Sequence, residues 1–196
     1  MNYICNDKVL FYQEDGRTDR LERLNQMLEI FPYDPENDEI SPNWMGYLTR
    51  LALKAEENID DRCLYVAAFL EDDILMMYAE SINTPKTEVY DKIASHFGIK
   101  YHLLAEEPQN EIFINTDVSR EHFDQEFAVI ITCAEESILE ELQLQLCESY
   151  PSVESLLDDF KGAGYEASSL KELREILNQE ANEYLRISVV DYQNCH

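Results

Sequence analysis

The sequence predicts an α+β protein in which a ferredoxin-like antiparallel sheet, with the order βαββαβ plus extra strands, carries helices on one face. Two apolar runs of strand length, 63–70 and 74–79, are separated by three acidic residues, a pattern typical of a β-hairpin. A strand pattern at 3–12 and a helical pattern at 18–30 precede the hairpin, and a second helical pattern follows it at 86–97. Strand, helix, hairpin, helix and strand is the ferredoxin-like order.

The first strand and helix lead into an insertion. The strand is apolar apart from a polar interruption at Asn6 and Asp7, and the helix is capped by Thr18 or Asp19. Prolines and acidic side chains follow in the next stretch, before another helical stripe. We therefore expect a loop-helix insertion at 31–60.

The helix after the hairpin carries both of its end signals. Thr84 is placed as the N-cap with Pro85 as the first helical residue, and Gly98 supplies the left-handed end. Strand patterns follow at 99–105, 111–116 and 123–132. These elements define an expected ferredoxin-like domain over residues 1–132.

The apolar stripes predict the core of this domain. Each predicted helix contributes one apolar stripe to this core, and the hairpin contributes the side chains that face the helices. The expected core residues are Leu24, Leu28, Val66, Leu75, Met77, Ile93 and Phe97.

Residues 133–196 read as a mostly helical appendage packed on that domain. Ser137 and Glu140 have the spacing of a capping box, which predicts a helix. Leucines alternate over 142–147, so a strand there is the alternative. The rest predicts a helix from Ser152, a helix opened by a second capping box at Ser169 and Glu172, and a strand at 185–192.

The charge excludes some classes of partner. Forty-one acidic against fifteen basic residues give a formal net charge of −26. Phosphates and anionic lipid would meet a negative field, so binding to nucleic acid or to a membrane surface is disfavoured. The longest apolar run has strand length, far short of a membrane span. A basic protein surface is the partner that this charge allows.

The cysteines and the first residues indicate a cytoplasmic protein. Five cysteines are widely spaced with no Cys-x-x-Cys motif, as expected for reduced thiols. Residues 1–15 contain a strand pattern rather than a basic segment followed by an apolar one, so we expect no signal peptide.

Two short segments resemble the YubB-type ferredoxin-like family, whose members are carried by phages, plasmids and conjugative elements. The start Asn2-Tyr3-Ile4-Cys5-Asn6 is similar to the family's Asn-Trp-Cys-x-Asn, and 101–108 is similar to its strand running into an acidic turn. The resemblance covers roughly residues 1–130. Tyr3 replaces the family's tryptophan, and its central Trp-Gly-Thr-Lys-Trp is missing. The resemblance implies the fold and a bacterial mobile-element origin, and it implies no activity.

No stretch carries a recognised catalytic or ligand motif. His102, Glu106 and His122 could form a metal site only if the fold assembled them, and no histidine has the spacing of a zinc site apart from the terminal Cys195-His196 pair. Five glycines leave no phosphate-binding loop. We therefore expect no metal and no cofactor.

The remaining reactive side chains favour structural or solvated roles. Cys5 and Cys63 lie on predicted neighbouring strands as interior, unreactive thiols. The carboxylates of Glu106 and Glu107, and those of 71–73, lie at predicted turns, where we expect them to be solvated.

The acidic residues of the appendage supply the candidate site. Between Glu135 and Asp159 there are acidic residues and no lysine or arginine. We expect an acidic partner face, and the protein to be a non-catalytic binding module; the alternative is an enzyme with a site between the sheet and the appendage. The residues assigned to this face are Glu140, Glu141, Glu148, Asp158 and Asp159.

Overall fold

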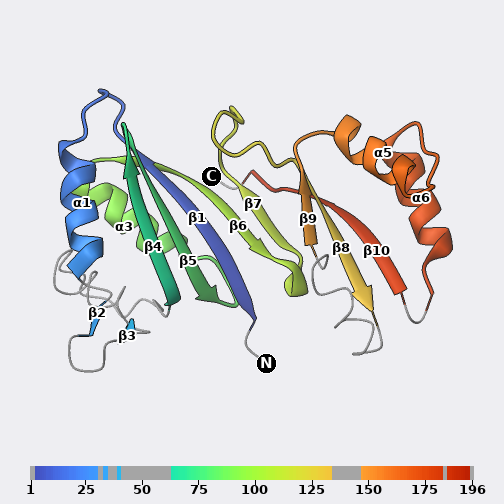
Figure 1. Ribbon diagram of the computed structural model, residues 1–196, viewed down its shortest axis with the longest axis horizontal. Coiled ribbons are helices and arrows are strands. Elements are labelled where there is room, and N and C mark those ends of the chain that lie inside the picture. Colours follow the sequence, from blue (N-terminus) through green and yellow to red (C-terminus); the bar gives the residue numbers. More distant parts are fainter. Residues whose placement is uncertain are drawn as a thin grey trace. The chain divides into compact units, whose positions relative to one another are not determined.

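The computed structural model describes residues 3–30, 33–34, 39–40, 63–133, 147–182 and 185–194. The chain forms two compact units, Met1–Ile112 and Phe113–His196 (Figure 1). Both combine antiparallel strands with helices, so the α+β class is confirmed. None of the helices among these residues is long and apolar enough to cross a membrane.

The first unit is built on β1 (Ile4–Tyr12), β4 (Cys63–Glu71), β5 (Ile74–Ile82) and β6 (Lys100–Glu107). These strands lie side by side in the order β4-β5-β1-β6, and each neighbouring pair is antiparallel. The predicted hairpin is confirmed, with β4 and β5 joined at its acidic turn. Because β1 is central, residues from the start of the chain lie next to two strands from much later in the sequence.

Helices α1 (Asp19–Ile30) and α3 (Thr87–Phe97) pack on one face of this sheet (Figure 1). Side chains alternate between the faces of a strand, so every second residue of β1 and β5 is buried beneath these helices. The predicted core is confirmed for six of its seven members, while the side chain of Val66 lies outside the described residues. The six buried residues are Leu24, Leu28, Leu75, Met77, Ile93 and Phe97.

Helix α3 begins later than its sequence signals predicted. The N-cap is Lys86, and the expected cap, Thr84, instead accepts a hydrogen bond from Ser81 Oγ at its main-chain oxygen. The carboxylate of Asp7, from β1, accepts a hydrogen bond from the main-chain N–H of Lys86, so a distant side chain fixes the start of the helix. The predicted end is confirmed: Gly98 is the C-cap, with a φ of 62°.

Part of the predicted insertion is described. Two short strands, β2 (Tyr33–Asp34) and β3 (Glu39–Ile40), pair antiparallel within the stretch expected to be loop. The helix predicted later in the insertion lies outside the described residues.

The second unit contains a three-stranded sheet, whereas the sequence predicts a mostly helical appendage over 133–196. The chain enters this unit within β7 (Ile112–Asn115), and β8 (Phe127–Cys133), β9 (Cys147–Tyr150) and β10 (Leu185–Asp191) form an antiparallel sheet in the order β10-β8-β9. We expected β8 in the first sheet; instead it is the central strand of the second. The boundary between the units therefore falls within β7, directly after Ile112, rather than following residue 132.

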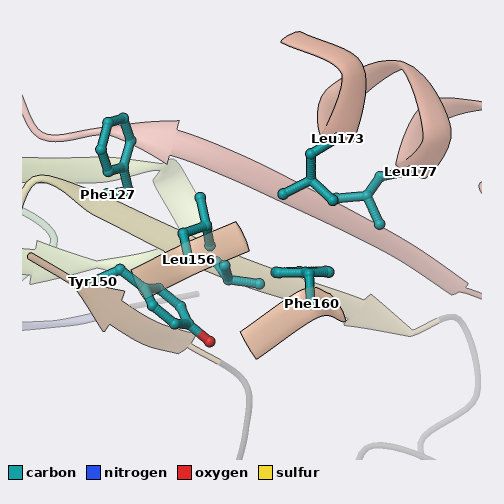
Figure 2. Packing of buried hydrophobic residues seen from close by; sticks show 7 residues of the cluster. Phe127, Tyr150, Leu156, Phe160, Leu173 and Leu177 are labelled. Atoms are coloured by element: carbon teal, nitrogen blue, oxygen red, sulfur yellow. The ribbon is translucent and has the colours of Figure 1, made fainter. Parts of the chain in front are cut away.

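Helices α5 (Val153–Gly162) and α6 (Leu170–Glu180) pack on this sheet and close a core of its own. Both helices begin where the sequence predicts: Ser152 is the N-cap of α5 and its Oγ accepts from Ser155 N–H, and Ser169 is the N-cap of α6 and its Oγ accepts from Glu172 N–H. Figure 2 shows side chains from β8, β9 and both helices gathered into one cluster: Phe127, Tyr150, Leu156, Phe160, Leu173 and Leu177.

Candidate functional site

The structure places three of the five predicted acidic residues in the second unit. Glu148 lies on β9, and Asp158 and Asp159 lie on α5; all three are exposed. Glu140 and Glu141 lie outside the described residues. No ion pair within the described part of the chain involves any of the three.

The hydroxyl of Tyr150 brings Glu148 and Asp159 together. Tyr150 ends β9 with only 7% of its surface exposed, and its hydroxyl donates to Asp159 Oδ2 at 2.7 Å. Glu148 precedes Tyr150 by two residues on the same strand, so both side chains leave the same face. We call Glu148, Tyr150 and Asp159 the Tyr150 patch.

The electrostatics of the patch follow from these positions. Burial, then the hydrogen bond to Asp159 and the charge of Glu148, raise the pKa of Tyr150. The phenol therefore stays neutral at physiological pH and remains a donor. It holds the Asp159 carboxylate in a fixed position at the surface, where this carboxylate and that of Glu148 can both accept from a cation.

A second polar cluster, which the sequence did not predict, lies in the first unit. The carboxylate of Asp7 is buried, with 1% of the residue exposed. Its Oδ2 accepts from Tyr90 Oη at 2.5 Å and from Ser81 Oγ and Lys86 N–H at 3.2 Å each, and its Oδ1 accepts from Cys5 Sγ at 3.2 Å. A signal was present, because Asp7 occupies a position in the strand pattern where the face toward the helices requires an apolar residue.

The titration properties of this cluster indicate a structural role. Burial raises the pKa of Asp7, and the four hydrogen bonds lower it by less. Burial, followed by the charge of Asp7, raises the pKa of the Cys5 thiol. A neutral buried thiol is not a nucleophile, as expected. The cluster instead ties β1 to β5 and to the start of α3.

Cys5 and Cys63 are not on neighbouring strands, contrary to the prediction. Cys5 of β1 and Cys63 of β4 both pair with Ser81 of β5, and β5 lies between the other two strands. The sequence could not give this order, because strand order depends on how the crossover helices place β1 between β5 and β6.

Glu107 corrects the expectation that the paired glutamates are solvated. It is fully buried, and its carboxylate accepts from the main-chain N–H groups of Gln109 and Asn110 at 3.0 and 2.7 Å, which fixes the 3-10 turn η2 (Pro108–Asn110). Burial is tolerated because the turn supplies both donors. The other acidic turn, 71–73, is exposed as expected.

The histidines considered for a metal have other surroundings. His102 stacks on Tyr12, with ring centroids 5.1 Å apart, and the main-chain N–H of His122 donates to the buried carboxylate of Asp117. Within the described ranges, no group of three or more His, Cys, Asp or Glu side chains could hold a metal ion.

No family model matches the chain, and no curated protein matches it.

Proposed function

We propose that this protein is a non-catalytic, acidic protein-binding module whose second unit meets a basic protein surface. The observation that carries the proposal is the Tyr150 patch. Two exposed carboxylates converge on one buried phenol, and no ion pair among the described residues neutralises either of them. Opposite charge on a partner would steer its approach and set its orientation.

The overall charge supports a protein partner rather than nucleic acid. A net charge of −26 repels phosphates, so direct nucleic-acid binding is disfavoured. An acidic surface of this kind can also occupy a basic site that otherwise binds nucleic acid, which is one form that the proposed interaction takes.

The buried titratable groups support binding rather than catalysis. Asp7 and Glu107 are satisfied by donors of the fold, and the Cys5 thiol is neutral. These groups hold helices and turns in place, whereas the exposed carboxylates of the Tyr150 patch are available to a partner.

The wider setting belongs to the same proposal. The strand order β4-β5-β1-β6, with every pair antiparallel, supports a ferredoxin-like fold for the first unit. The YubB-type resemblance of residues 1–130 supports an accessory role in a bacterial mobile element, and the spacing of the cysteines supports a cytoplasmic location.

The test removes charge while preserving side-chain shape. We expect a variant carrying Glu140→Gln, Glu141→Gln, Asp158→Asn and Asp159→Asn to bind a labelled arginine- and lysine-rich peptide more weakly than the unmodified protein. Its affinity should also depend less steeply on salt, because fewer fixed charges take part. Fluorescence anisotropy at low and physiological ionic strength measures both effects.

The control changes the net charge equally at exposed carboxylates elsewhere in the second unit. It carries Glu121→Gln, Asp124→Asn, Glu126→Gln and Glu166→Gln, all at exposed positions. If both variants lose affinity equally, only the overall charge matters and no acidic face exists. Unchanged binding in the first variant would refute the proposal.

A further inference from the structure

The first unit carries a surface groove that shares no residue with the Tyr150 patch. It has a volume of about 450 Å³ and lies on the face of the sheet away from α1 and α3. Its outward residues alternate along the strands with ones that are buried beneath the helices. Four strands contribute side chains to its lining: Asn6 and Lys8 from β1, Ala67 and Phe69 from β4, Tyr78 and Glu80 from β5, and Glu106 from β6.

One wall of the groove is aromatic and exposed. Phe69 is 60% exposed and Tyr78 is 37% exposed, and their rings meet edge to face with centroids 6.2 Å apart. Ala67 lies directly opposite Tyr78, and its short side chain leaves the face of the sheet open at that point. Large apolar side chains left together at a surface mark a binding site more often than isolated ones do.

The other wall carries two carboxylates. Asn6 of β1 pairs with Glu80 of β5 on one side and with Glu106 of β6 on the other. Neighbouring strands are about 4.8 Å apart, so these two residues stand about 10 Å apart across Asn6, a span that one cationic side chain can bridge. Lys8 is the one basic residue among the described residues that line the groove, so the two carboxylates outnumber it.

We propose that this groove binds an arginine-bearing segment of a partner protein, with the guanidinium between the two glutamates and against the ring of Tyr78. The inference rests on the proposed function in that the partner is a basic protein, and it adds the anchoring site. Arginine fits better than lysine, because its planar guanidinium both pairs with carboxylates and stacks on aromatic faces. The volume is within the range of sites that hold a small ligand, enough for a side chain and its neighbours.

Charge argues against the other occupants. A second copy of this chain would also carry −26 and would be repelled. Single-stranded nucleic acid could stack on the two rings, but its phosphates would lie beside Glu80 and Glu106.

The direct test is a nuclear magnetic resonance titration of the isotope-labelled full chain. The probe is a capped peptide with one arginine between glycine and leucine, and its control has citrulline, which is similar in shape and neutral. We expect the arginine peptide to shift the amide signals of Asn6, Tyr78 and Glu80, and the citrulline peptide to shift them much less. No shift at these amides with millimolar arginine peptide overturns the proposal.

Two variants separate the contributions. Tyr78→Leu keeps apolar bulk and removes the aromatic face, and should weaken binding about two- to fivefold. Glu80→Gln should weaken it up to about fivefold at low salt, with a shallower dependence on salt. The matched control is Glu71→Gln, which removes one exposed carboxylate on the same strand as Phe69 but outside the groove lining, and should bind as the unmodified protein does.

The outcomes distinguish this site from the Tyr150 patch. Loss of binding only in the variant with Glu140→Gln, Glu141→Gln, Asp158→Asn and Asp159→Asn would overturn the groove and leave the proposed function standing. Loss only on substitution in the groove would support the groove and contradict the acidic face of the second unit. An oligothymidylate that shifts the same amides more strongly than the arginine peptide would also overturn the proposal.

Discussion

At the scale of single residues, Asp7 links the sheet of the first unit to helix α3. A buried carboxylate loses its hydration, which raises its pKa, while four donors and the start of a helix favour the charged form. Desolvation is the larger effect, so the net pKa lies above its ordinary value of 3.8. Asp7 therefore favours the folded state most when it is protonated.

This sign gives a prediction for stability against pH. The contribution of Asp7 is fully present below pH 3.8 and is lost as the pH rises through the raised pKa of the folded state. Asp7→Asn cannot titrate, so the stability of the variant relative to the unmodified protein should improve as the pH rises through that window. Urea unfolding followed by circular dichroism measures it, in dilute solution because the pI is near 4.2.

Asp15 provides a control of opposite sign. Its hydrogen bonds with Arg17 lower its pKa to about 2, so its contribution is present above the ordinary pKa of 3.8 and is lost as the pH falls. The stability of the Asp15→Asn variant relative to the unmodified protein should therefore fall as the pH rises from about 2 to above 3.8. If the two variants show the same trend with pH, the assignment for Asp7 is wrong.

At the scale of elements, helix ends depend on a few backbone positions. Gly98 ends α3 with a φ of 62°, and its main-chain oxygen accepts from Arg20 Nη1 at 2.5 Å. A Cβ at this position would lie 3.0 Å from the same nitrogen. Gly162, the last residue of α5, has no positive φ and nothing within 4 Å of such a Cβ.

These two glycines should therefore respond oppositely to the same substitution. Gly98→Ala should lower the free energy of unfolding by about 1–2 kcal/mol, because a Cβ is strained in the left-handed region. Gly162→Ala should raise it by about 0.4–1 kcal/mol, because alanine reduces the freedom of the unfolded chain without strain. Urea denaturation of both variants checks the pair, and equal effects would contradict the assigned conformations.

At the scale of the whole molecule, the net charge opposes compaction. A formal charge of −26 places many like charges on one folded chain. Exposed ion pairs such as Lys171–Glu175 and Arg174–Asp191 offset little of this repulsion.

Screening should consequently stabilise the protein. Raising the ionic strength from about 0.01 to about 0.15 M shortens the Debye length from about 30 to about 8 Å, so we expect Tm to rise. The variant with four neutralised carboxylates at Glu140, Glu141, Asp158 and Asp159 should show a smaller rise. A Tm that falls with added sodium chloride would show that attractive ion pairs dominate instead.

Residue patterns in the sequence predict only part of the candidate site. The run of acidic residues without lysine or arginine pointed to Glu148 and Asp159, but pairing them required Tyr150 to be buried at the end of β9 with α5 against it. The groove required the register that sets Glu80 and Glu106 on either side of Asn6. The groove joins residues that are remote in the chain, and the Tyr150 patch joins a strand to the helix that follows it.

The sequence by itself determined the local elements: the hairpin at its acidic turn, the stripes of α1 and α3, the caps at Ser152 and Ser169, and the end of α3 at Gly98. These depend on side-chain period and on backbone preferences within a few residues. Only the tertiary structure decided that β8 joins β9 and β10, that Asp7 starts α3 and that Glu107 is buried. Strand partners and buried polar contacts depend on which apolar faces meet, and many pairings satisfy the same local pattern.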